Sequence, residues 1–351
     1  MKKKTKVIVT GGTGYIGSHT VVELLQQDYE VAIIDNLCNS GKEALKWIEK
    51  ITGILPVFTQ GDLRDVNSCR VFFERHRDAE AVIHFAALKA VGESVQKPLE
   101  YYENNISSTL LLLDNMIKYE IPKIIFSSSA TVYGKYETLP LTEQSPVFFP
   151  ATSPYGITKQ ISEHIIKDAI GAEQSLQAGI SLRYFNPVGA HSSGLLGELP
   201  QGIPNNLMPF ITQTAAGIRE KLMVFGDDYD TPDGTAIRDY IHIEDLALAH
   251  AVALGRLVDQ NYRDPFEVFN LGTGRGSSVM EVIQSFEKTS GLKLNYVITN
   301  RRAGDAACFY ADAEMAQIEL GWKAKYKLDD MTTSAWRWEQ YYREKILNNK
   351  K

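Results

Sequence analysis

Residues 6–17 read KVIVTGGTGYIG, so a short apolar run enters a glycine-rich turn and then a stretch with helical apolar spacing. This order predicts a β-strand that ends at Thr10 and a helix that begins near Tyr15. Glycines let a turn bend sharply and approach a pyrophosphate closely, and a helix N-terminus presents free amide groups to that anion. The segment therefore predicts a dinucleotide site, although a glycine-rich turn can also serve packing alone.

Apolar runs alternate with helical stretches through the first half of the chain. The predicted strands cover residues 6–10, 31–35, 57–60, 81–85, 124–127 and 180–185, and the predicted helices cover residues 15–26, 66–75, 99–119 and 154–170. This alternation predicts a parallel sheet with helices on both faces, which is an α/β fold of the Rossmann-type doubly wound class. After Asn186 glycine and proline become frequent, and we expect a smaller α/β lobe there.

Acidic and small residues follow several of the predicted strands. Asp35 closes the second strand, eighteen positions after Gly17. A carboxylate there accepts hydrogen bonds from a ribose diol and repels a 2′-phosphate, which favours NAD over NADP, although it can also cap the strand end. Asp62 and the pair Phe85-Ala86 follow the third and fourth strands, where ligands bind in open α/β sheets. Taken alone, Asp62 is more often a helix N-cap.

The length of 351 residues corresponds to about two folding units at roughly 150 residues each. We expect an NAD-binding Rossmann domain over residues 1–186. Segments near residues 236–275 are expected to return to it, because residues 268–271 again have the pattern of a buried strand. Residues 187–345 are expected to form mainly the substrate-binding lobe.

Composition and charge exclude several classes of protein. Hydrophobic residues make up 44% of the chain and charged residues 23%, which is typical of a globular protein. The net charge of −6 argues against a nucleic-acid binder, and no apolar run is long enough to span a membrane. Cys38, Cys69 and Cys308 lack the paired spacing of a disulfide framework or a zinc site, and the histidines form no metal-binding pair. We therefore expect a cytoplasmic protein without a metal and without a targeting segment.

A tyrosine and a lysine stand four positions apart at Tyr155 and Lys159, and Ser129 follows the fifth predicted strand. Positions i and i+4 share one helix face, so the Lys159 ammonium can lie near the Tyr155 phenol. A phenol with the ordinary pKa of about 10 cannot act as a base at neutral pH, but a nearby ammonium favours its phenolate form. The spacing therefore indicates a proton-transfer pair, with Ser129 holding a substrate hydroxyl. An exposed helical pair is the alternative.

Together these motifs resemble the extended short-chain dehydrogenase/reductase family, whose members act on nucleotide sugars with a bound nicotinamide cofactor. Four segments are similar to the branch that epimerises UDP-hexoses, and the resemblance as a whole runs essentially from Val7 to Trp338. They are FAALKAVGES at 85–94, SSSATVYG at 127–134, RYFNPVGA at 183–190 and PNNLMP at 204–209. The resemblance implies NAD as cofactor, a UDP-hexose as substrate and a homodimer. It also implies interconversion of UDP-glucose and UDP-galactose by transient oxidation at C4, rotation of the 4-keto sugar and return of the hydride to its other face.

The resemblance also assigns residues to the site. It makes Ser129, Tyr155 and Lys159 catalytic. It places in the NAD site Gly11, Gly14, Tyr15, Ile16, Gly17, Asp35, Asn36, Asp62, Leu63, Phe85, Ala86, Lys89, Asn104, Tyr155, Lys159 and Phe185. It places in the UDP-hexose site Ser129, Asn186, Asn206, Leu207, Arg238, Arg302, Asp305 and Phe309. The alternative for each arginine is an ordinary charged residue on the surface. One departure is Ala87, where many relatives have glycine, and its methyl group slightly crowds the cofactor.

A nucleotide-sugar dehydratase is the nearest alternative, because it shares every step to the 4-ketone before it eliminates water. That elimination needs an additional acid and base, which related dehydratases carry where Ala130 and Thr131 stand here. Nucleotide-sugar decarboxylases likewise tend to carry a glutamate in place of Thr131. A protein that binds NAD without catalysis is a further alternative, and the presence of Ser129, Tyr155 and Lys159 argues against it.

In this family the position four residues after the aspartate of an Arg-x-Gly-Asp segment limits the size of the sugar. Counting from Asp305 gives Phe309, whose bulk would exclude an N-acetyl group, whereas the small Cys308 is one place earlier. We therefore expect UDP-glucose and UDP-galactose to be preferred over N-acetylated forms. The helices at 99–119 and 154–170 resemble those that pair across the family's homodimer, and ordinary packing on the sheet is their alternative.

Overall fold

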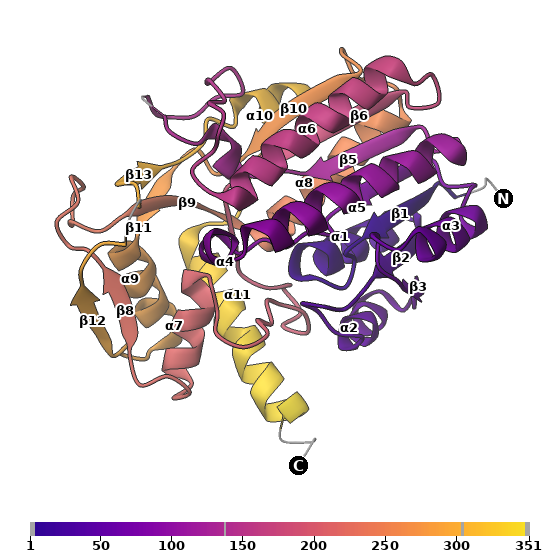
Figure 1. The fold of residues 1–351 in the computed structure, drawn as a ribbon. Helices are drawn as coiled ribbons and strands as arrows, with labels where there is room; N and C mark the ends of the chain where they lie inside the picture. Colours follow the sequence, from indigo (N-terminus) through magenta and orange to yellow (C-terminus); the bar gives the residue numbers. More distant parts are fainter. Residues whose placement is uncertain (1–3, 137, 303–304, 348–351) are drawn as a thin grey trace.

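A seven-stranded sheet lies at the centre of the computed structural model, which describes residues 4–136, 138–302 and 305–347 (Figure 1). Its strand order is β10-β6-β5-β4-β1-β2-β3, and every neighbouring pair is parallel. The order reverses between β1 and β4, which is where open α/β sheets bind ligands. The expected doubly wound, Rossmann-type fold is confirmed.

The strands of this sheet agree closely with those predicted. They are β1 Lys6–Thr10, β2 Glu30–Asp35, β3 Val57–Gln60, β4 Ala81–His84, β5 Lys123–Ser127, β6 Ala178–Tyr184 and β10 Phe266–Leu271. All six strands predicted in the first half of the chain are present within two residues of their expected bounds. The apolar run of β1, Val7, Ile8 and Val9, is fully buried because helices cover both faces of the sheet. β10 comes from late in the chain and lies at the edge beside β6.

Helices pack on both faces of the sheet, as Figure 1 shows. One face holds α1 Tyr15–Gln26, α2 Glu43–Thr52 and α8 Ile243–Val258, and the other holds α3 Val66–Arg75, α5 Pro98–Lys118 and α6 Pro154–Ala172. Helices α1 and α3 begin and end where predicted. The sequence predictions omitted α2, although Ala44, Leu45 and Ile48 have the spacing of one helix face and are buried.

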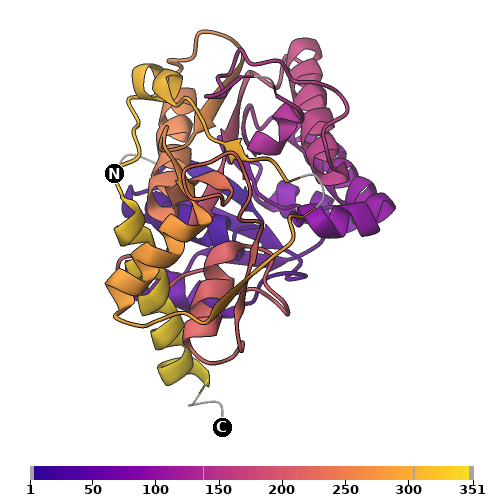
Figure 2. The same ribbon diagram turned by 90° about the vertical axis from the view of Figure 1, so that its left-hand side faces the viewer.

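A smaller lobe packs three helices on a two-stranded parallel sheet. Its elements are α7 Leu207–Ala215, β8 Leu222–Phe225, α9 Val279–Ser290, β12 Tyr296–Thr299 and α11 Leu328–Tyr341. Met208, Phe286 and Met331 are buried in their shared core. Figures 1 and 2 show α11 beside α9, where Ser285 Oγ donates a hydrogen bond to Asp329 Oδ1 at 2.7 Å.

A four-stranded sheet connects residues that lie far apart in the sequence. Its strands are β7 Asn186–Val188, β9 Ile237–His242, β11 Gly276–Ser278 and β13 Cys308–Phe309. β9 pairs with each of the other three, and its pairing with β13 sets Arg238 opposite Phe309. The remaining helical segments are α4 Val91–Gln96, the 3-10 turn η1 Ala130–Tyr133, α10 Glu314–Glu319 and the π-helical turn η2 Tyr342–Leu347.

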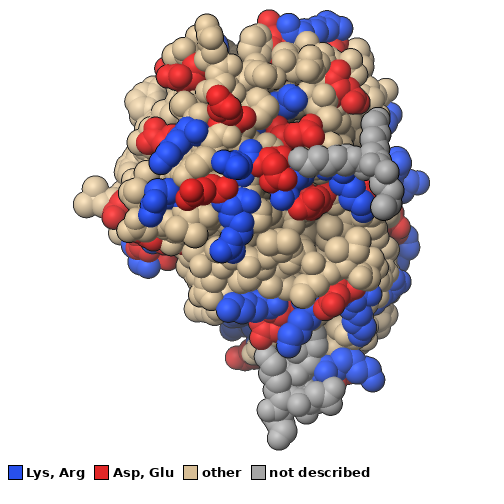
Figure 3. All heavy atoms as spheres, turned by 90° about the vertical axis from the view of Figure 1, so that its right-hand side faces the viewer, with Lys and Arg blue, Asp and Glu red and all other residues tan. Residues whose placement is uncertain are grey.

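The described residues include neither a membrane-spanning helix nor a cluster of metal-binding side chains. No helix in that part of the chain is both long and apolar enough to cross a bilayer. Its histidine, cysteine and acidic side chains form no group of three or more that could hold a metal ion. On the face in Figure 3, basic and acidic side chains are interspersed, so this face offers no basic track for a phosphate backbone.

We predict that Gly17→Ala destabilises the protein. A Cβ at Gly17 would lie 2.3 Å from the carbonyl oxygen of Gly11, which is backbone and cannot turn away. The free energy of unfolding should fall by about 2 kcal/mol or more, because overpacking against backbone is costly. Gly171→Ala in α6 is the matched control, since its Cβ meets no atom within 4 Å. Alanine there should stabilise the helix by up to about 1 kcal/mol. Urea unfolding measures both, and equal stabilities would contradict the prediction.

Candidate active site

The glycine-rich turn between β1 and α1 presses against the loop that follows β4. Gly11 has a φ of +70°, and a Cβ there would lie 2.7 Å from the amide nitrogen of Ala86. Gly14 precedes α1 and supplies no side-chain cap, so the first amide groups of the helix, at Tyr15 and Ile16, are available to an anion. This cradle of glycine backbone and helix N-terminus can hold a pyrophosphate.

Asp35 ends β2 with its side chain turned to the glycine-rich turn. Its Oδ2 accepts a hydrogen bond from Thr13 N at 3.1 Å, and its Oδ1 accepts from Leu37 N at 2.9 Å and from Ser40 Oγ at 3.2 Å. The side chain is nearly buried. A carboxylate has about four lone-pair positions, so Asp35 can still accept a further hydrogen bond from a ribose hydroxyl.

Asp62 lies after β3 but does not cap the next helix. The N-cap of α3 is Asp65, whose carboxylate accepts from the backbone of the first turn. Asp62 instead binds Arg64 through Nε and Nη2 at 3.0 and 2.8 Å, and it accepts from Asn36 Nδ2 at 3.0 Å. The hydrogen bonds from Arg64 hold the pKa of the Asp62 carboxyl well below its ordinary value. The ionised carboxylate of Asp62 and the amide of Asn36 therefore lie together, next to the buried Leu63.

Asn105 joins the loop after β4 to helix α6, and the sequence predictions did not include it. Its side chain accepts from Leu88 N at 2.8 Å and donates to Leu88 O and Thr158 Oγ1, each at 3.0 Å. Asn104, which was predicted for the cofactor site, donates to Asn105 Oδ1 at 3.0 Å. These bonds fix the loop that contains Phe85 against α6. The only signal in the sequence was a pair of asparagines within an otherwise apolar helical pattern.

Tyr155 and Lys159 lie on one face of α6. Pro154 occupies the first turn of this helix, and Ser153 Oγ caps it. Both functional side chains are buried, with 7% of Tyr155 and 4% of Lys159 exposed. The Lys159 ammonium lies 5.8 Å from the centre of the Tyr155 ring and donates a hydrogen bond to Ser127 O at 2.6 Å. The lysine therefore ties α6 to the end of β5.

Ser129 follows β5 and begins the turn η1. Its Oγ accepts hydrogen bonds from Thr131 N at 3.2 Å and from Thr131 Oγ1 at 3.0 Å. Because Thr131 donates in both bonds, the Ser129 hydroxyl keeps its own proton for another acceptor. Ser129 also lies near the Tyr155 phenol, whose pKa it lowers. The fold thus brings together the three side chains that were expected to be catalytic.

Burial opposes charge on both members of the Tyr155–Lys159 pair. It raises the pKa of Tyr155 to about 12, against a lowering by the hydrogen bond with Ser129. It lowers the pKa of Lys159 to about 7, against a rise caused by Glu163. The expected lowering of the Tyr155 pKa by Lys159 is not found in the protein alone, because the ammonium binds Ser127 O instead. The buried pair therefore favours a neutral phenol and an easily lost lysine proton.

Arg238 and Asp305 form the charged part of the expected nucleotide site. Arg238 Nη2 lies 2.5 Å from Asp305 Oδ1, and both side chains remain partly exposed. The guanidinium of Arg302 stacks on the ring of Phe225, 3.9 Å from its centre. Stacking leaves the edge of that guanidinium free to bind phosphate oxygens in a bidentate manner. Residues 303 and 304, which complete the Arg-x-Gly-Asp segment, lie outside the described residues.

Arg301, which the sequence left unassigned, lies next to these residues but has different partners. Its Nε pairs with Asp228 Oδ1 at 2.6 Å, and its guanidinium covers the ring of Tyr229. Asn186 begins β7, where it pairs with Tyr240 of β9. The polar groups expected to bind UDP therefore come from β7, β9 and the segment before β13.

Glu198 connects the two halves of the expected site, and sequence reasoning missed it. Its Oε1 accepts a hydrogen bond from Asn206 Nδ2 at 2.9 Å and lies 3.6 Å from Lys89 Nζ. Its carbonyl oxygen accepts from Trp338 Nε1 at 3.0 Å. Asn206 precedes α7, which begins at Leu207. A glutamate in a loop rich in glycine and proline carries no signal in the sequence that could have identified this role.

Three aromatic rings form a wall on the side of the site that includes Phe309. The Phe309 ring lies 5.1 Å from Phe185 and 5.4 Å from Tyr136, measured between ring centres. The Tyr136 hydroxyl donates to the carbonyl oxygen of Cys308. Backbone pairing of β13 with β9 sets Phe309, not Cys308, opposite Arg238.

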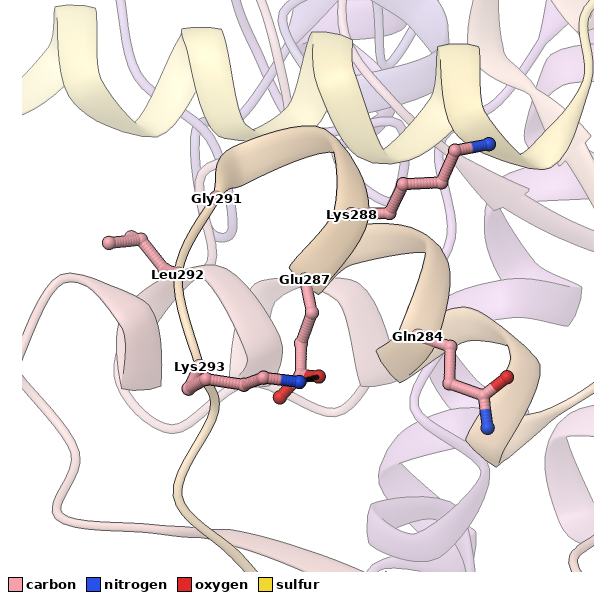
Figure 4. A pocket seen from close by; sticks show the side chains of 6 residues that line it. All are labelled: Gln284, Glu287, Lys288, Gly291, Leu292 and Lys293. Atoms are coloured by element: carbon pink, nitrogen blue, oxygen red, sulfur yellow. Dashed lines mark hydrogen bonds and ion pairs between the residues drawn. The ribbon is translucent and has the colours of Figure 1, made fainter.

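A shallow hollow of about 310 Å³ at the end of α9 is separate from this site (Figure 4). None of the expected site residues lines it. Glu287 and Lys293 lie across it and pair at 2.6 Å, and Lys288 pairs with Asp329 outside the hollow, so each charge of its lining has a partner.

Comparison with known proteins agrees with this geometry. A model of the family described as GDP-mannose 4,6 dehydratase matches residues 8–335. A UDP-glucose 4-epimerase from Bacillus subtilis is 51% identical, covering 95% of this chain and 96% of its own length. The chain belongs to the UDP-glucose 4-epimerase family.

Solved structures of this family share the whole fold. The epimerase from Stenotrophomonas maltophila, solved with NAD and formylated UDP-arabinopyranose, has a TM-score of 0.92 and 48% identity, and 97% of this chain and 99% of that chain are covered. The epimerase from Bifidobacterium longum, solved with NAD⁺ and UDP, has a TM-score of 0.90, 50% identity and the same coverage. The UDP-Glc/GlcNAc 4-epimerase of Campylobacter jejuni has a TM-score of 0.82 and 38% identity, over 96% of this chain and 99% of that one.

We predict that the Lys159 ammonium titrates near pH 7, far below the ordinary range of a lysine, because burial penalises its charge. Nuclear magnetic resonance of ¹³C-labelled lysine side chains measures this, with Lys159→Met to assign the signal. Lys97 is the internal control, since its hydrogen bond with Glu93 raises its pKa. A Lys159 titration above pH 10 would contradict the burial argument.

Proposed function

We propose that this chain binds NAD and interconverts UDP-glucose and UDP-galactose by inverting the hexose C4. The observation that carries the proposal is that the side chains of Tyr155, Lys159 and Ser129 are buried next to one another. This group lies at the carboxyl ends of the parallel strands, and the glycine-rich turn lies at the same end of the sheet. A phenol, an ammonium and a hydroxyl placed together can move a proton on and off a sugar hydroxyl. Membership of the epimerase family supports the same reaction.

The glycine-rich turn and Asp35 fit NAD. A Cβ at Gly11 would fill the space between the turn and the loop after β4, so the cradle depends on glycine. Asp35 can accept a ribose hydroxyl and would repel the extra phosphate of NADP. When bound, the oxidised nicotinamide supplies a reversible hydride acceptor for the sugar C4 and a positive charge that favours the phenolate of Tyr155. Asn36 and Asp62 are proposed to hold the adenosine end.

Each residue of the catalytic group has a distinct role in this proposal. The Tyr155 oxygen takes the proton of the hexose 4-hydroxyl and later returns it. The Ser129 hydroxyl orients that substrate hydroxyl, and its own proton is free to do so because Thr131 donates to its oxygen. Lys159 stabilises the phenolate, since the pKa of Tyr155 is raised by burial and needs positive charge beside it to fall.

The uridine diphosphate is proposed to stay bound while the oxidised sugar turns about its linkage and presents its other face. Arg238 and Arg302 suit the diphosphate because their guanidinium groups bind phosphate oxygens in pairs. Asp305 suits the ribose diol, as Asp35 does. We accordingly assign NAD binding mainly to residues 1–186 and nucleotide-sugar binding mainly to residues 187–345.

A dehydratase reaction is disfavoured by the turn after β5. Ala130 carries no acid or base, and the Thr131 hydroxyl is occupied in a hydrogen bond to Ser129. Elimination of water would need a further acid and base at these places. The name of the matching family model therefore reflects a shared fold and cofactor site, and the proposed activity remains epimerisation.

We also propose a homodimer in which α5 and α6 face a second copy. These helices pack side by side in Figure 1, on the outer layer of the sheet. Apolar side chains of α4 and α5 point outward, with 63% of Val95, 81% of Leu99 and 46% of Leu110 exposed. An outward apolar stripe of this kind is typical of a protein interface. The free thiols of Cys38, Cys69 and Cys308 agree with the proposed cytoplasmic location.

We predict that the purified protein converts UDP-galactose to UDP-glucose with no added NAD, because the hydride returns to the sugar and the cofactor is not consumed. Nuclear magnetic resonance of the sugar anomeric signals measures the conversion. Tyr155→Phe should lower kcat by about 10²–10⁴-fold, the usual contribution of a proton-transfer group, and should leave UDP affinity unchanged. Normal turnover by this variant, or no turnover by a parent protein that holds NAD, would refute the proposal.

We predict that Phe309→Cys increases turnover of UDP-N-acetylglucosamine relative to UDP-glucose. Removal of the ring opens space in the wall formed with Phe185 and Tyr136. Cys308→Ala, one residue earlier, is the control and should leave the ratio of kcat/KM values for the two substrates unchanged. If Cys308→Ala changes that ratio and Phe309→Cys does not, the size limit lies at Cys308.

A further inference from the structure

Glu163 is the third residue on the helix face that contains Tyr155 and Lys159. It follows Lys159 by four positions and Tyr155 by eight, so all three lie along one side of α6. Its carboxylate is buried, with 6% of the residue exposed. A buried carboxylate is costly unless hydrogen-bonded partners compensate its charge.

Four hydrogen bonds reach this carboxylate from β6 and from the residue that follows β5. Ser128 Oγ and Ser181 Oγ donate to Glu163 Oε1 at 2.6 and 2.7 Å. Arg183 donates to Oε1 through Nε at 3.0 Å and to Oε2 through Nη2 at 2.6 Å. Although burial raises the pKa of Glu163, the bonds from Arg183 and the serines outweigh it and hold the pKa below its ordinary value. Glu163 is therefore an ionised clamp between α6, β6 and the end of β5.

Ser128 stands between the two serines that the catalytic group uses. Ser127 O accepts a hydrogen bond from the Lys159 ammonium, and Ser129 lies near Tyr155, whose pKa it lowers. The hydrogen bond from Ser128 to Glu163 fixes the middle residue of this triplet, and so it sets where both neighbours lie. Placement matters here, because a shift of about 1 Å in a reacting group can cost about a hundredfold in rate.

Glu163 is also the carboxylate that faces Lys159. The other ionisable groups near the ammonium are Tyr155 on α6 and His84 on β4, and Tyr184 on β6 lies near Tyr155. Burial and the nearby ammonium lower the pKa of His84 to about 3, and burial raises the pKa of Tyr184, so both are neutral at pH 7. Arg183, also on β6, is cationic and binds Glu163 with two hydrogen bonds. The negative charge of Glu163 therefore acts against the loss of the Lys159 proton.

We propose that Glu163 is a positioning residue of this site, which anchors the serine triplet at the end of β5 and keeps the Lys159 ammonium charged. The proposal rests on the proposed function, since Glu163 would act by positioning the groups around Tyr155 and Lys159. Glu163 acts through these neighbours and is not itself a proton donor or acceptor to the sugar. Arg183 balances its charge, and the guanidinium also lies over the Tyr133 ring at 5.0 Å.

A second buried pair in the protein provides a matched control. Arg256 on α8 binds Glu267 on β10 through Nε at 2.7 Å and Nη2 at 2.8 Å, and their side chains are 9% and 6% exposed. Besides Arg256, Glu267 accepts a bond from Arg263 N. The pair has the same two-bond arginine–glutamate chemistry but contacts no residue of the catalytic group. Arg256 also binds Glu319, which keeps its ion pair with Arg263 when Arg256 is replaced.

The experiment compares the double variants Glu163→Gln/Arg183→Met and Glu267→Gln/Arg256→Met. Removal of both charges avoids leaving a lone buried ion, which would unfold the protein. Glutamine can still accept the Ser128 bond, so the first variant mainly removes the charge. Glu163→Ala/Arg183→Met removes the charge and the anchor together. Thermal unfolding and circular dichroism establish that each variant folds.

Three measurements on the purified protein then test the proposal. We expect the Lys159 titration to move to lower pH in both Glu163 variants and to stay in place in the control. The alkaline limb of the kcat–pH profile should shift in the same direction, because Glu163 is the member of the removed pair whose charge raises the pKa of Lys159. The alanine variant should lose about tenfold or more in kcat beyond the glutamine variant, with KM unchanged, because the serine triplet is no longer held. The control pair should retain the parental profile.

Two results would overturn the proposal. The Lys159 titration and the pH profile could match the parent in both Glu163 variants, which would make the pair a purely structural one. Alternatively, the control pair could shift them equally, which would make the effect a general loss of rigidity. Failure of the proposed function is distinguishable, because it would appear as full activity in Tyr155→Phe, whereas the Lys159 titration tests Glu163 without any turnover.

Discussion

The hydrogen bond from the Lys159 ammonium to the carbonyl oxygen of Ser127 is the contact on which the site depends. A buried ammonium cannot remain in an apolar interior without a polar partner, and at 2.6 Å this carbonyl oxygen is a strong one. The bond joins α6, which carries Tyr155, to the end of β5, which leads to Ser129. Together with the hydrogen bond from Ser128 to Glu163, it sets how these two elements lie against each other, which apolar contact alone would not do.

The polar interior around this bond follows from the same need. A buried lysine needs neighbours that form hydrogen bonds or carry the opposite charge. Here these are Ser127 and Ser128 at the strand end, together with Glu163, which is bound to Arg183. Burial makes each of these interactions stronger than it would be in water, and it makes an unsatisfied group more costly. These satisfied bonds hold the region in one arrangement, whereas Arg238 and Asp305 of the expected nucleotide site remain partly exposed.

Much of the fold could be predicted because local patterns decide it. Residues 6–17 contain the strand, the turn and the helix start in one segment, and α1 and α3 have the expected bounds. Long-range contacts decided the remainder. Asp62 resembles a helix cap in the sequence, but Asp65 lies at the correct distance from the amides of α3 and Asp62 binds Arg64 instead. Glu198 carries no local signal and Asn105 only that of two adjacent asparagines, because the partners of both residues are distant in the chain.

The sequence by itself determined the alternation of strands and helices, the glycine-rich turn and the placement of Tyr155 and Lys159 on one helix face, since these depend only on residue spacing. The tertiary structure decided which charges are buried. It turned Lys159 toward Ser127 and raised the pKa of Tyr155, because desolvation depends on the surroundings of a group in space and not on its neighbours in the chain. It likewise set Phe309 opposite Arg238, because only the pairing of β13 with β9 brings those residues together.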